Sequence, residues 1–182
     1  KILSEYKKLL SSYSGIAVRE NTAVGLLRQM DIECAGQVLD PTLLLTGDEW
    51  SRMIKKDMGG KYVLVYQLHN NPALSKYAVR FAEHVGLPLY RVSPTFHQIR
   101  RGGKFIYLPD LPDFLSYIKN STYFITDSFH GTAFALNFNR QFIEILPNNK
   151  TGNRNQSIRI ESRQRGCIVP GGARTCQQQE KR

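Results

Sequence analysis

The stretch from Tyr123 to Leu136 constrains the fold more than any other part of the chain. A β-branched and aromatic run, Tyr123-Phe-Ile-Thr126, ends at Asp127-Ser128, and a helix-like run follows from His130. Such a change from strand to helix through a tight turn is typical of parallel α/β sheets. In these sheets ligands bind beyond the carboxyl ends of the strands, where helix N-termini point their N–H groups.

The same alternation extends to both sides of this stretch. Apolar strand-like runs at 62–68, 89–92, 104–108 and 141–146 alternate with helix-like runs at 73–85, 110–121 and 130–138. This order predicts an α/β fold with a Rossmann-like parallel sheet and helices on both faces. Upstream, we expect helices at 2–11, 22–30 and 48–56, a short buried strand at 15–20, and a strand end and loop at 38–45.

The composition fits a globular protein, since 41% of the 182 residues are hydrophobic and 22% are charged. No apolar run is long enough to cross a bilayer, and the three cysteines form no C-x-x-C pair. We therefore expect a cytoplasmic protein, with a peripheral position at the inner face of the membrane left open. After Leu146 the chain turns polar, so we predict one domain over 1–161 and a basic, poorly ordered tail over 162–182.

The net charge of +10 raises the question of an anionic partner. The tail 162–182 holds five Lys and Arg residues and one Glu, which contribute +4, so residues 1–161 carry +6. In that larger part the basic residues are scattered and form no Lys/Arg helix face. We therefore expect no nucleic acid as a partner and favour a small anionic ligand.

His130 is the first candidate for chemistry, because it follows the strand at the predicted helix N-terminus. A histidine there can act as a general acid or base. Asp127 and Ser128 can cap the helix, Gly131 lets a ligand approach the backbone, and Thr132 adds a hydroxyl. We therefore predict a ligand site built from these five residues.

Cations and polar groups elsewhere could join this edge of the sheet. Arg19 ends the predicted strand 15–20, where it is either an anion clamp or half of an internal ion pair. Lys150 and Arg154 follow the last predicted strand, and His69 and Asn70 follow the strand 62–68. Guanidinium groups bind phosphate and carboxylate in a bidentate manner, so such a set suits a phosphorylated, carboxylated ligand.

The remaining histidines are given no role in the chemistry. His84 falls on the polar side of a helix, and His97 lies in a loop-like segment. Four histidines at wide, irregular spacing do not make a ligand set, so we expect no metal. No G-x-G-x-x-G run and no P-loop is present in the sequence.

Several segments together resemble the polysaccharide pyruvyl transferase family. They are Ile16-Ala-Val-Arg-Glu20, Val38-Leu-Asp-Pro-Thr-Leu-Leu-Leu45 followed by Trp50, Tyr62-Val-Leu-Val-Tyr66, and Ile125-Thr-Asp-Ser-Phe-His-Gly-Thr-Ala-Phe134. They occur in order, over residues 15–160. The resemblance implies a GT-B type fold of two domains, of which this chain would supply the C-terminal one; the N-terminal domain of the same protein would be a partner.

The resemblance also implies an activity. Such enzymes transfer the enolpyruvyl unit of phosphoenolpyruvate to a sugar of a bacterial polysaccharide or its precursor, and a pyruvate ketal forms. His130 matches the family's acid/base histidine, and Arg19 matches a residue implicated in holding the donor. Donor binding would also involve Ser128, Gly131, Thr132, Lys150 and Arg154. The saccharide acceptor is free or lipid-linked, and no cofactor is implied besides the donor substrate.

One departure from the family pattern affects the donor site. Many members carry an arginine two residues before the histidine, where this chain has Ser128. Its task would then pass to Lys150, Arg154 or another cation. Two alternatives stay open at this point: a GT-B type glycosyltransferase that uses a nucleotide-sugar donor, and a half-domain that binds a ligand without catalysis.

Overall fold

The computed structural model describes residues 2–145 and 166–169 of the chain. Contacts divide the chain into two compact units, Lys1–Leu44 and Leu45–Arg182. The sequence analysis placed no boundary after Leu44. Each unit is described here by itself.

The first unit contains two short helices and a turn. They are α1 (Ile2–Leu10), α2 (Asn21–Gln29) and the 3-10 turn η1 (Pro41–Leu43). The Asp40 carboxylate caps the turn, because it accepts a hydrogen bond from the Thr42 amide at 2.9 Å. Both predicted helices and the predicted loop are therefore confirmed.

The buried strand predicted at 15–20 is wrong. The segment forms one isolated parallel bridge, between Val18 and Gln37, and none of its residues is buried. Burial of a strand requires neighbours on both faces, and this unit has no sheet that the segment could join. Arg19 therefore does not lie at the end of a buried strand.

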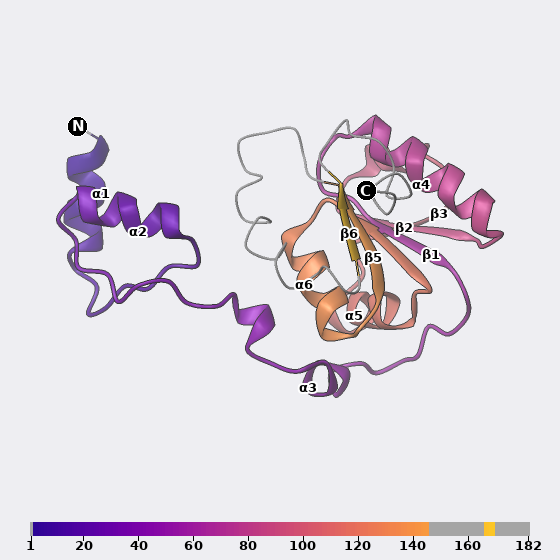
Figure 1. Cartoon of the computed structure of the whole chain (residues 1–182), viewed down its shortest axis with the longest axis horizontal. Helices are drawn as coiled ribbons and strands as arrows, with labels where there is room; N and C mark the ends of the chain where they lie inside the picture. The colour runs from indigo at the N-terminus through magenta and orange to yellow at the C-terminus, as the bar shows by residue number, and fades with distance from the viewer. Residues whose placement is uncertain (1, 146–165, 170–182) are drawn as a thin grey trace, which may run out of the picture. The chain divides into compact units, whose positions relative to one another are not determined.

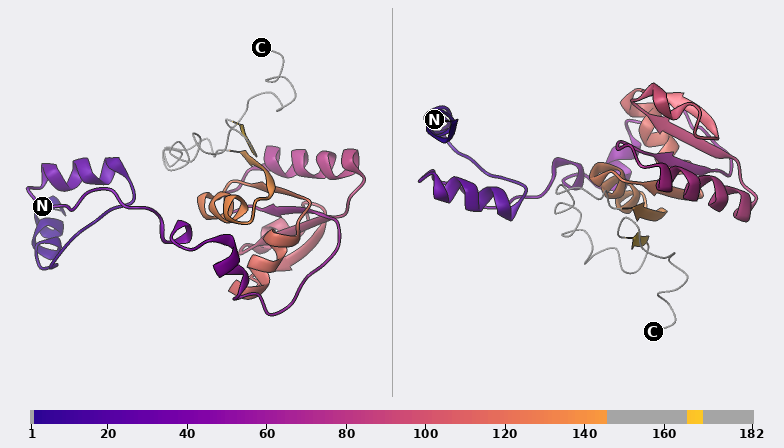
Figure 2. Two further views of the ribbon diagram at one scale, coloured as in Figure 1. Left: turned by 60° about the horizontal axis from the view of Figure 1, so that its bottom comes forward. Right: turned by 90° about the horizontal axis from the view of Figure 1, so that it is seen from above.

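The second unit is a six-stranded sheet with helices (Figures 1 and 2). Its elements are α3 (Gly47–Ser51), β1 (Val63–Tyr66), α4 (Pro72–Val85), β2 (Leu89–Ser93), the 3-10 turn η2 (Phe96–Gln98), β3 (Lys104–Tyr107), α5 (Leu111–Asn120), β4 (Tyr123–Thr126), α6 (Phe129–Asn137), β5 (Gln141–Ile145) and β6 (Gly166–Val169). All neighbouring strands are parallel, in the order β3-β2-β1-β4-β5-β6. The predicted Rossmann-like fold is confirmed.

Side chains alternate between the two faces of the sheet, and each face has its own core. Val63, Val65 and Ile125 pack with apolar residues of α4 on one face. Leu64 and Phe124 pack with residues of α5, α6 and Trp50 on the other face. Figure 1 shows α4 on one side of the sheet and α5 and α6 on the opposite side.

Local signals set the ends of the helices that flank the sheet. The Asn71 side chain caps α4, Pro72 occupies its first position, and Gly86 ends it at a φ of 66°. The carboxylate of Asp110 caps α5. The helix predicted at 48–56 is shorter in the structure, where α3 ends at Ser51. Its start is fixed by a capping box, in which Thr46 is the N-cap and Glu49 the third helical residue.

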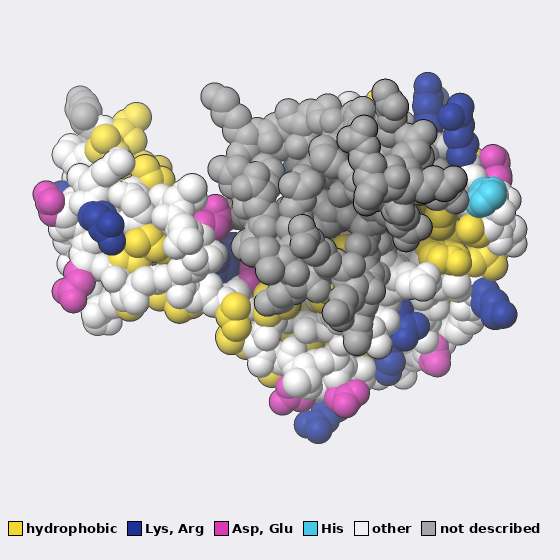
Figure 3. Space-filling view, viewed as in Figure 1, with side chains coloured by type: hydrophobic (Ala, Val, Ile, Leu, Met, Phe, Trp, Pro, Cys, Tyr) yellow, Lys and Arg dark blue, Asp and Glu magenta, His cyan; other side chains and the backbone are white. Residues whose placement is uncertain are grey.

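Strand β6 lies inside the segment 162–182, which we expected to be poorly ordered. It pairs with β5 in parallel register, Phe142 beside Gly166, so that expectation fails for these four residues. The rest of the segment lies outside the described residues. On the face that Figure 3 shows, Lys and Arg side chains of the described residues stand in several separate places among acidic ones.

Candidate active site

The strand order places a topological switch point at the carboxyl edge of the sheet, between β1 and β4. From β1 the chain moves outward through β2 and β3, and from β4 it moves outward in the opposite direction through β5 and β6. Connections that leave in opposite directions open a gap where ligands of doubly wound sheets bind. The loop after β1 carries His69, and the turn after β4 carries Asp127 and leads into α6, whose second residue is His130.

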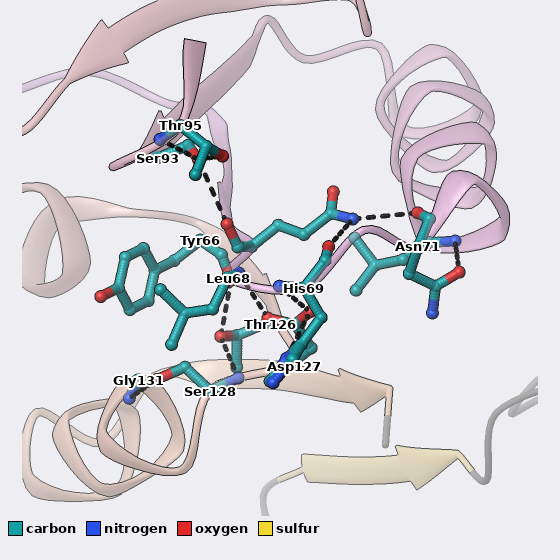
Figure 4. A network of polar contacts seen from close by, with 12 residues as sticks. Tyr66, Leu68, His69, Asn71, Ser93, Thr95, Thr126, Asp127, Ser128 and Gly131 are labelled. Carbon is teal, nitrogen blue, oxygen red and sulfur yellow. Dashed lines mark hydrogen bonds and ion pairs between the residues drawn. The ribbon is translucent and has the colours of Figure 1, made fainter. Parts of the chain in front are cut away.

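Asp127 joins the two sides of this switch point. Its carboxylate is completely buried and accepts hydrogen bonds from the Leu68 amide at 2.7 Å and from the His69 amide at 3.0 Å. The imidazole Nδ1 of His69 also lies 3.2 Å from Asp127 Oδ2 (Figure 4). Three donors thus converge on one buried carboxylate, which fixes the β1 loop to the end of β4.

The turn after Asp127 is held by short-range hydrogen bonds. The Thr126 hydroxyl donates to the Tyr66 carbonyl at 2.8 Å and accepts from the Ser128 amide at 3.0 Å. The Ser128 hydroxyl accepts from the Gly131 amide at 3.3 Å and so caps α6, as predicted. Strand, turn and helix therefore form one rigid support for His130.

Gly131 is required for packing, whereas the approach of a ligand to its backbone stays a prediction. A Cβ at this position would lie 2.8 Å from Thr126 Oγ1 and 3.2 Å from Phe124 Cζ. The helix lies so close to the sheet that only glycine fits. The sequence could not show this, because a glycine near a helix start suits either purpose.

The Gly131 and Thr132 amides already have acceptors inside the protein. The Thr132 amide donates to the Ser128 carbonyl at 3.0 Å, and its hydroxyl donates to the same oxygen at 3.2 Å. Both residues are buried. These hydrogen bonds shape the turn, and the contact of the two amides with a ligand stays a prediction.

His130 is half-buried at the second position of α6. Its ring meets the Phe129 ring edge to face, with centroids 5.5 Å apart. The histidine thus stands at a helix N-terminus on the carboxyl edge of the sheet, where the sequence predicted it.

The loop after β1 is held from its other side by Gln67, which the sequence analysis missed. The Gln67 amide nitrogen donates to the His69 carbonyl at 2.8 Å and to the Asn71 carbonyl at 2.9 Å. The neighbouring Asn70 pairs through its side-chain oxygen with the Arg101 guanidinium. The loop that carries His69 is consequently held on one side by Asp127 and on the other by Gln67.

Arg91 lies beneath this loop and is fully buried in β2. It donates to Gln67 Oε1 at 3.2 Å, to the Gly102 carbonyl at 3.1 Å and to the Arg101 carbonyl at 3.1 Å. Burial, and then the nearby Arg101 charge, lower the pKa of Arg91 to about 10. The sequence did hold a signal for this network, because Gln67 interrupts the apolar run 62–68 and Arg91 interrupts the run 89–92.

A cavity of about 260 Å³ opens at the same edge, on the face of the sheet that α5 covers. The ends of β1, β2 and β3 contribute Tyr66, Ser93 and Leu108 to its wall. Burial, and then the Asp127 charge, raise the pKa of Tyr66, so its phenol remains a hydrogen-bond donor. Leu108 has a φ of 36°, a strained conformation for leucine of the kind that often accompanies ligand sites.

Arg19 belongs to the first unit, where it forms an ion pair with Asp40. The Asp40 carboxylate is nearly inaccessible to solvent and also accepts from the Thr42 hydroxyl at 2.7 Å. Of the two interpretations of Arg19, the internal ion pair is the one observed. Its role in donor binding stays a prediction, while Lys150 and Arg154 lie outside the described residues.

Comparison with known proteins decides the family. The family model for polysaccharide pyruvyl transferase matches residues 2–149. The chain belongs to the polysaccharide pyruvyl transferase family. No curated protein matches this sequence.

Two solved structures similar to this chain are of enzymes with bound nucleotides or nucleotide sugars. A Methanocaldococcus jannaschii UDP-GlcNAc 2-epimerase, in complex with UDP-GlcNAc and UDP, matches with a TM-score of 0.56 and 18% identity, over 86% of this chain and 50% of its own. The Escherichia coli heptosyltransferase WaaC, with ADP, matches with a TM-score of 0.48 and 10% identity, over 85% of this chain and 52% of its own. This pyruvyl transferase family member therefore spans about half the length of these proteins, and its fold is that of one Rossmann-like half of a GT-B enzyme.

The described part of this family member contains no helix long and apolar enough to span a membrane. Nor do its described residues bring three His, Cys, Asp or Glu side chains together as a metal site would require. The carboxyl edge of the sheet thus offers a histidine at a helix start, a carboxylate–histidine pair and an adjoining cavity as its chemical groups.

Proposed function

We propose that this chain is the donor-side half of an enzyme that transfers the enolpyruvyl unit of phosphoenolpyruvate to a saccharide as a pyruvate ketal. The observation that carries the proposal is the family match over residues 2–149, which includes the turn that bears His130. Phosphoenolpyruvate brings its own activated group, so we expect no cofactor. The acceptor is a sugar of a bacterial polysaccharide or its precursor, free or lipid-linked.

Transfer of the enolpyruvyl unit requires that a carbon atom of phosphoenolpyruvate receive a proton. Protonation of the methylene carbon of phosphoenolpyruvate generates an oxocarbenium-like centre at its neighbour. A sugar hydroxyl attacks this centre, and a second hydroxyl then displaces phosphate and closes the ketal. A positioned acid typically contributes ~10²–10⁴-fold to such a step.

We assign the acid role to His130. A helix N-terminus disfavours a protonated histidine, so an acid at this place needs a nearby anion. Asp127 lies buried in the turn that precedes α6, and the bound donor brings a carboxylate and a phosphate of its own. Arg19, Lys150 and Arg154 are the cations proposed to hold those two donor groups.

A companion N-terminal domain would hold the acceptor and close the site against water. We propose that the assembled enzyme works in the cytoplasm or at the inner face of the membrane. Family membership supports a saccharide acceptor for this arrangement.

A second candidate function is transfer from a nucleotide sugar. The observation in its favour is that the Methanocaldococcus jannaschii epimerase with this fold is in complex with UDP-GlcNAc and UDP. If this function holds, the chain should bind uridine diphosphate in preference to phosphoenolpyruvate. A third candidate, ligand binding without catalysis, would leave binding intact and turnover absent in the complete protein.

Calorimetric titration of the chain with phosphoenolpyruvate, and separately with uridine diphosphate, separates the first two candidates. We expect selective binding of phosphoenolpyruvate that weakens in His130→Ala and persists in His84→Ala, which alters an exposed histidine of α4. Preference for uridine diphosphate would refute the pyruvyl donor. Equal affinity of the two variants would refute the placement of the donor beside His130.

A further inference from the structure

The ring of His69 contacts a buried carboxylate and is partly exposed to solvent. Its side chain is 41% exposed, whereas the Asp127 side chain is 0% exposed. An ionised carboxylate only accepts hydrogen bonds, so the contact of 3.2 Å places the ring proton on Nδ1. When the ring is neutral, Nε2 carries a lone pair, and no described residue hydrogen-bonds to that atom.

We propose that His69, oriented by Asp127, is a general base that takes the proton from an attacking hydroxyl of the saccharide acceptor. This inference rests on the proposed pyruvyl transfer. It adds a second proton-handling histidine to the one at the start of α6, and it gives Asp127 a positioning role toward His69.

The proton balance of ketal formation calls for such a group. Phosphoenolpyruvate and two hydroxyls yield a ketal and inorganic phosphate, with one C–H bond and two C–O bonds formed and the C–O bond to phosphate broken. The acid gives a proton to the methylene carbon, while each hydroxyl loses one. Of the two protons released, one restores the acid and the other leaves with phosphate. A base that accepts them while the hydroxyls attack is needed, and His69 at Nε2 supplies it.

The topology places the acid and the base beyond the carboxyl ends of two adjacent strands. His69 lies three residues beyond Tyr66, and His130 lies four residues beyond Thr126. Tyr66 and Thr126 are register partners at the ends of the adjacent strands β1 and β4. Two histidines on neighbouring strand ends can serve one substrate from two directions, as acid and base catalysis of addition to a double bond requires.

The environment of His69 suits the role of a general base. Asp127 lies beside the His69 ring, and an adjacent carboxylate stabilises the imidazolium that forms when a base takes a proton. His69 is also fixed at its backbone, because its amide donates to Asp127 and its carbonyl accepts from Gln67. Little reorganisation is therefore needed when the ring takes the proton.

The substitution His69→Asn separates a catalytic role from a structural one. The asparagine amide nitrogen can occupy the place of Nδ1 and keep the contact with Asp127, while the atom that acts as base is lost. The two backbone hydrogen bonds to Asp127 do not involve the side chain and remain. The matched control is His97→Asn, at an exposed position in η2.

The experiment measures pyruvyl transfer from phosphoenolpyruvate by the full-length enzyme that carries this chain. We expect His69→Asn to lower kcat by about 10²–10⁴-fold, with the KM for phosphoenolpyruvate changed by no more than about twofold. His97→Asn should match the wild type. A His69→Asn variant that retains the wild-type kcat overturns the proposed base, and a wild-type enzyme that never consumes phosphoenolpyruvate overturns the proposed function itself.

The ring itself provides a second readout that needs no turnover. Long-range ¹H–¹⁵N correlation spectra distinguish the two neutral tautomers of each histidine. We expect the His69 ring of the intact chain to carry its proton on Nδ1, because Asp127 accepts there. A His69 ring protonated at Nε2 would overturn the proposal.

Discussion

Replacement of Gly131 by alanine tests how closely α6 must approach the sheet. The added methyl would lie 2.8 Å from Thr126 Oγ1, 3.2 Å from Phe124 Cζ and 3.3 Å from Tyr66 Cδ1. Thr126 cannot move without loss, because its hydroxyl bonds to the Tyr66 carbonyl and to the Ser128 amide. The helix must therefore shift away from the strands.

The expected cost follows from three contributions. Overpacking of a well-packed core typically costs about 1–3 kcal/mol. Weakening of the two hydrogen bonds of Thr126 adds about 1 kcal/mol each if they break. Alanine regains at most about 1 kcal/mol through its higher helix propensity. We expect Gly131→Ala to lower the free energy of unfolding by roughly 2 kcal/mol.

Urea unfolding followed by tryptophan fluorescence suits this test. Trp50 is the single tryptophan, and its ring packs against Phe134 of α6 with centroids 5.1 Å apart. The matched control is Gly25→Ala in α2, where an added Cβ meets nothing within 4 Å. The control should leave the fluorescence transition unchanged or raise its midpoint. A Gly131→Ala transition at or above the wild-type midpoint would refute the close-packing argument.

Two further predictions concern the sheet. Arg91→Met should lower the free energy of unfolding by about 3 kcal/mol, because it removes three hydrogen bonds of a fully buried side chain, to Gln67 Oε1 and to the Gly102 and Arg101 carbonyls; an unchanged urea midpoint would contradict the network. Burial raises the pKa of Tyr62, so the unfolded chain releases that proton first and stability should fall as pH rises above about 10. Tyr62→Phe loses the hydrogen bond to the Tyr117 carbonyl, about 1 kcal/mol at neutral pH, and should show a shallower alkaline decline in thermal melts than the wild type.

Hydrophobic periodicity was sufficient to predict five of the six strands of the sheet, all but β6. Strands β1 and β4 are runs of apolar residues whose two faces are both covered, and such runs remain visible without any tertiary information. The segment 15–20 shows the limit of this signal. It has the same apolar character, yet it forms only one bridge, because a strand needs partners and the sequence does not say which runs will meet.

The candidate site was predictable in location but not in its contacts. His130, Asp127 and His69 follow strands, so parallel topology alone brings them to one edge. The pairing of Asp127 with His69 depends on the register between β1 and β4, which spans about sixty residues of sequence and has no local signal. Gln67 and Arg91 were hidden for a related reason, since a polar residue in an apolar run reveals neither its partner nor its purpose.

The most direct test of the central claim is the fate of phosphoenolpyruvate labelled with ¹³C at the carbon that bears phosphate. The full-length enzyme that carries this chain is incubated with the labelled donor and a saccharide acceptor, and NMR follows the label. The account predicts that the label appears in a ketal carbon bonded to two sugar oxygens, with one phosphate released for each ketal, and that His130→Ala abolishes this product. Intact phosphoenolpyruvate alongside consumption of a nucleotide sugar by the same enzyme would contradict it.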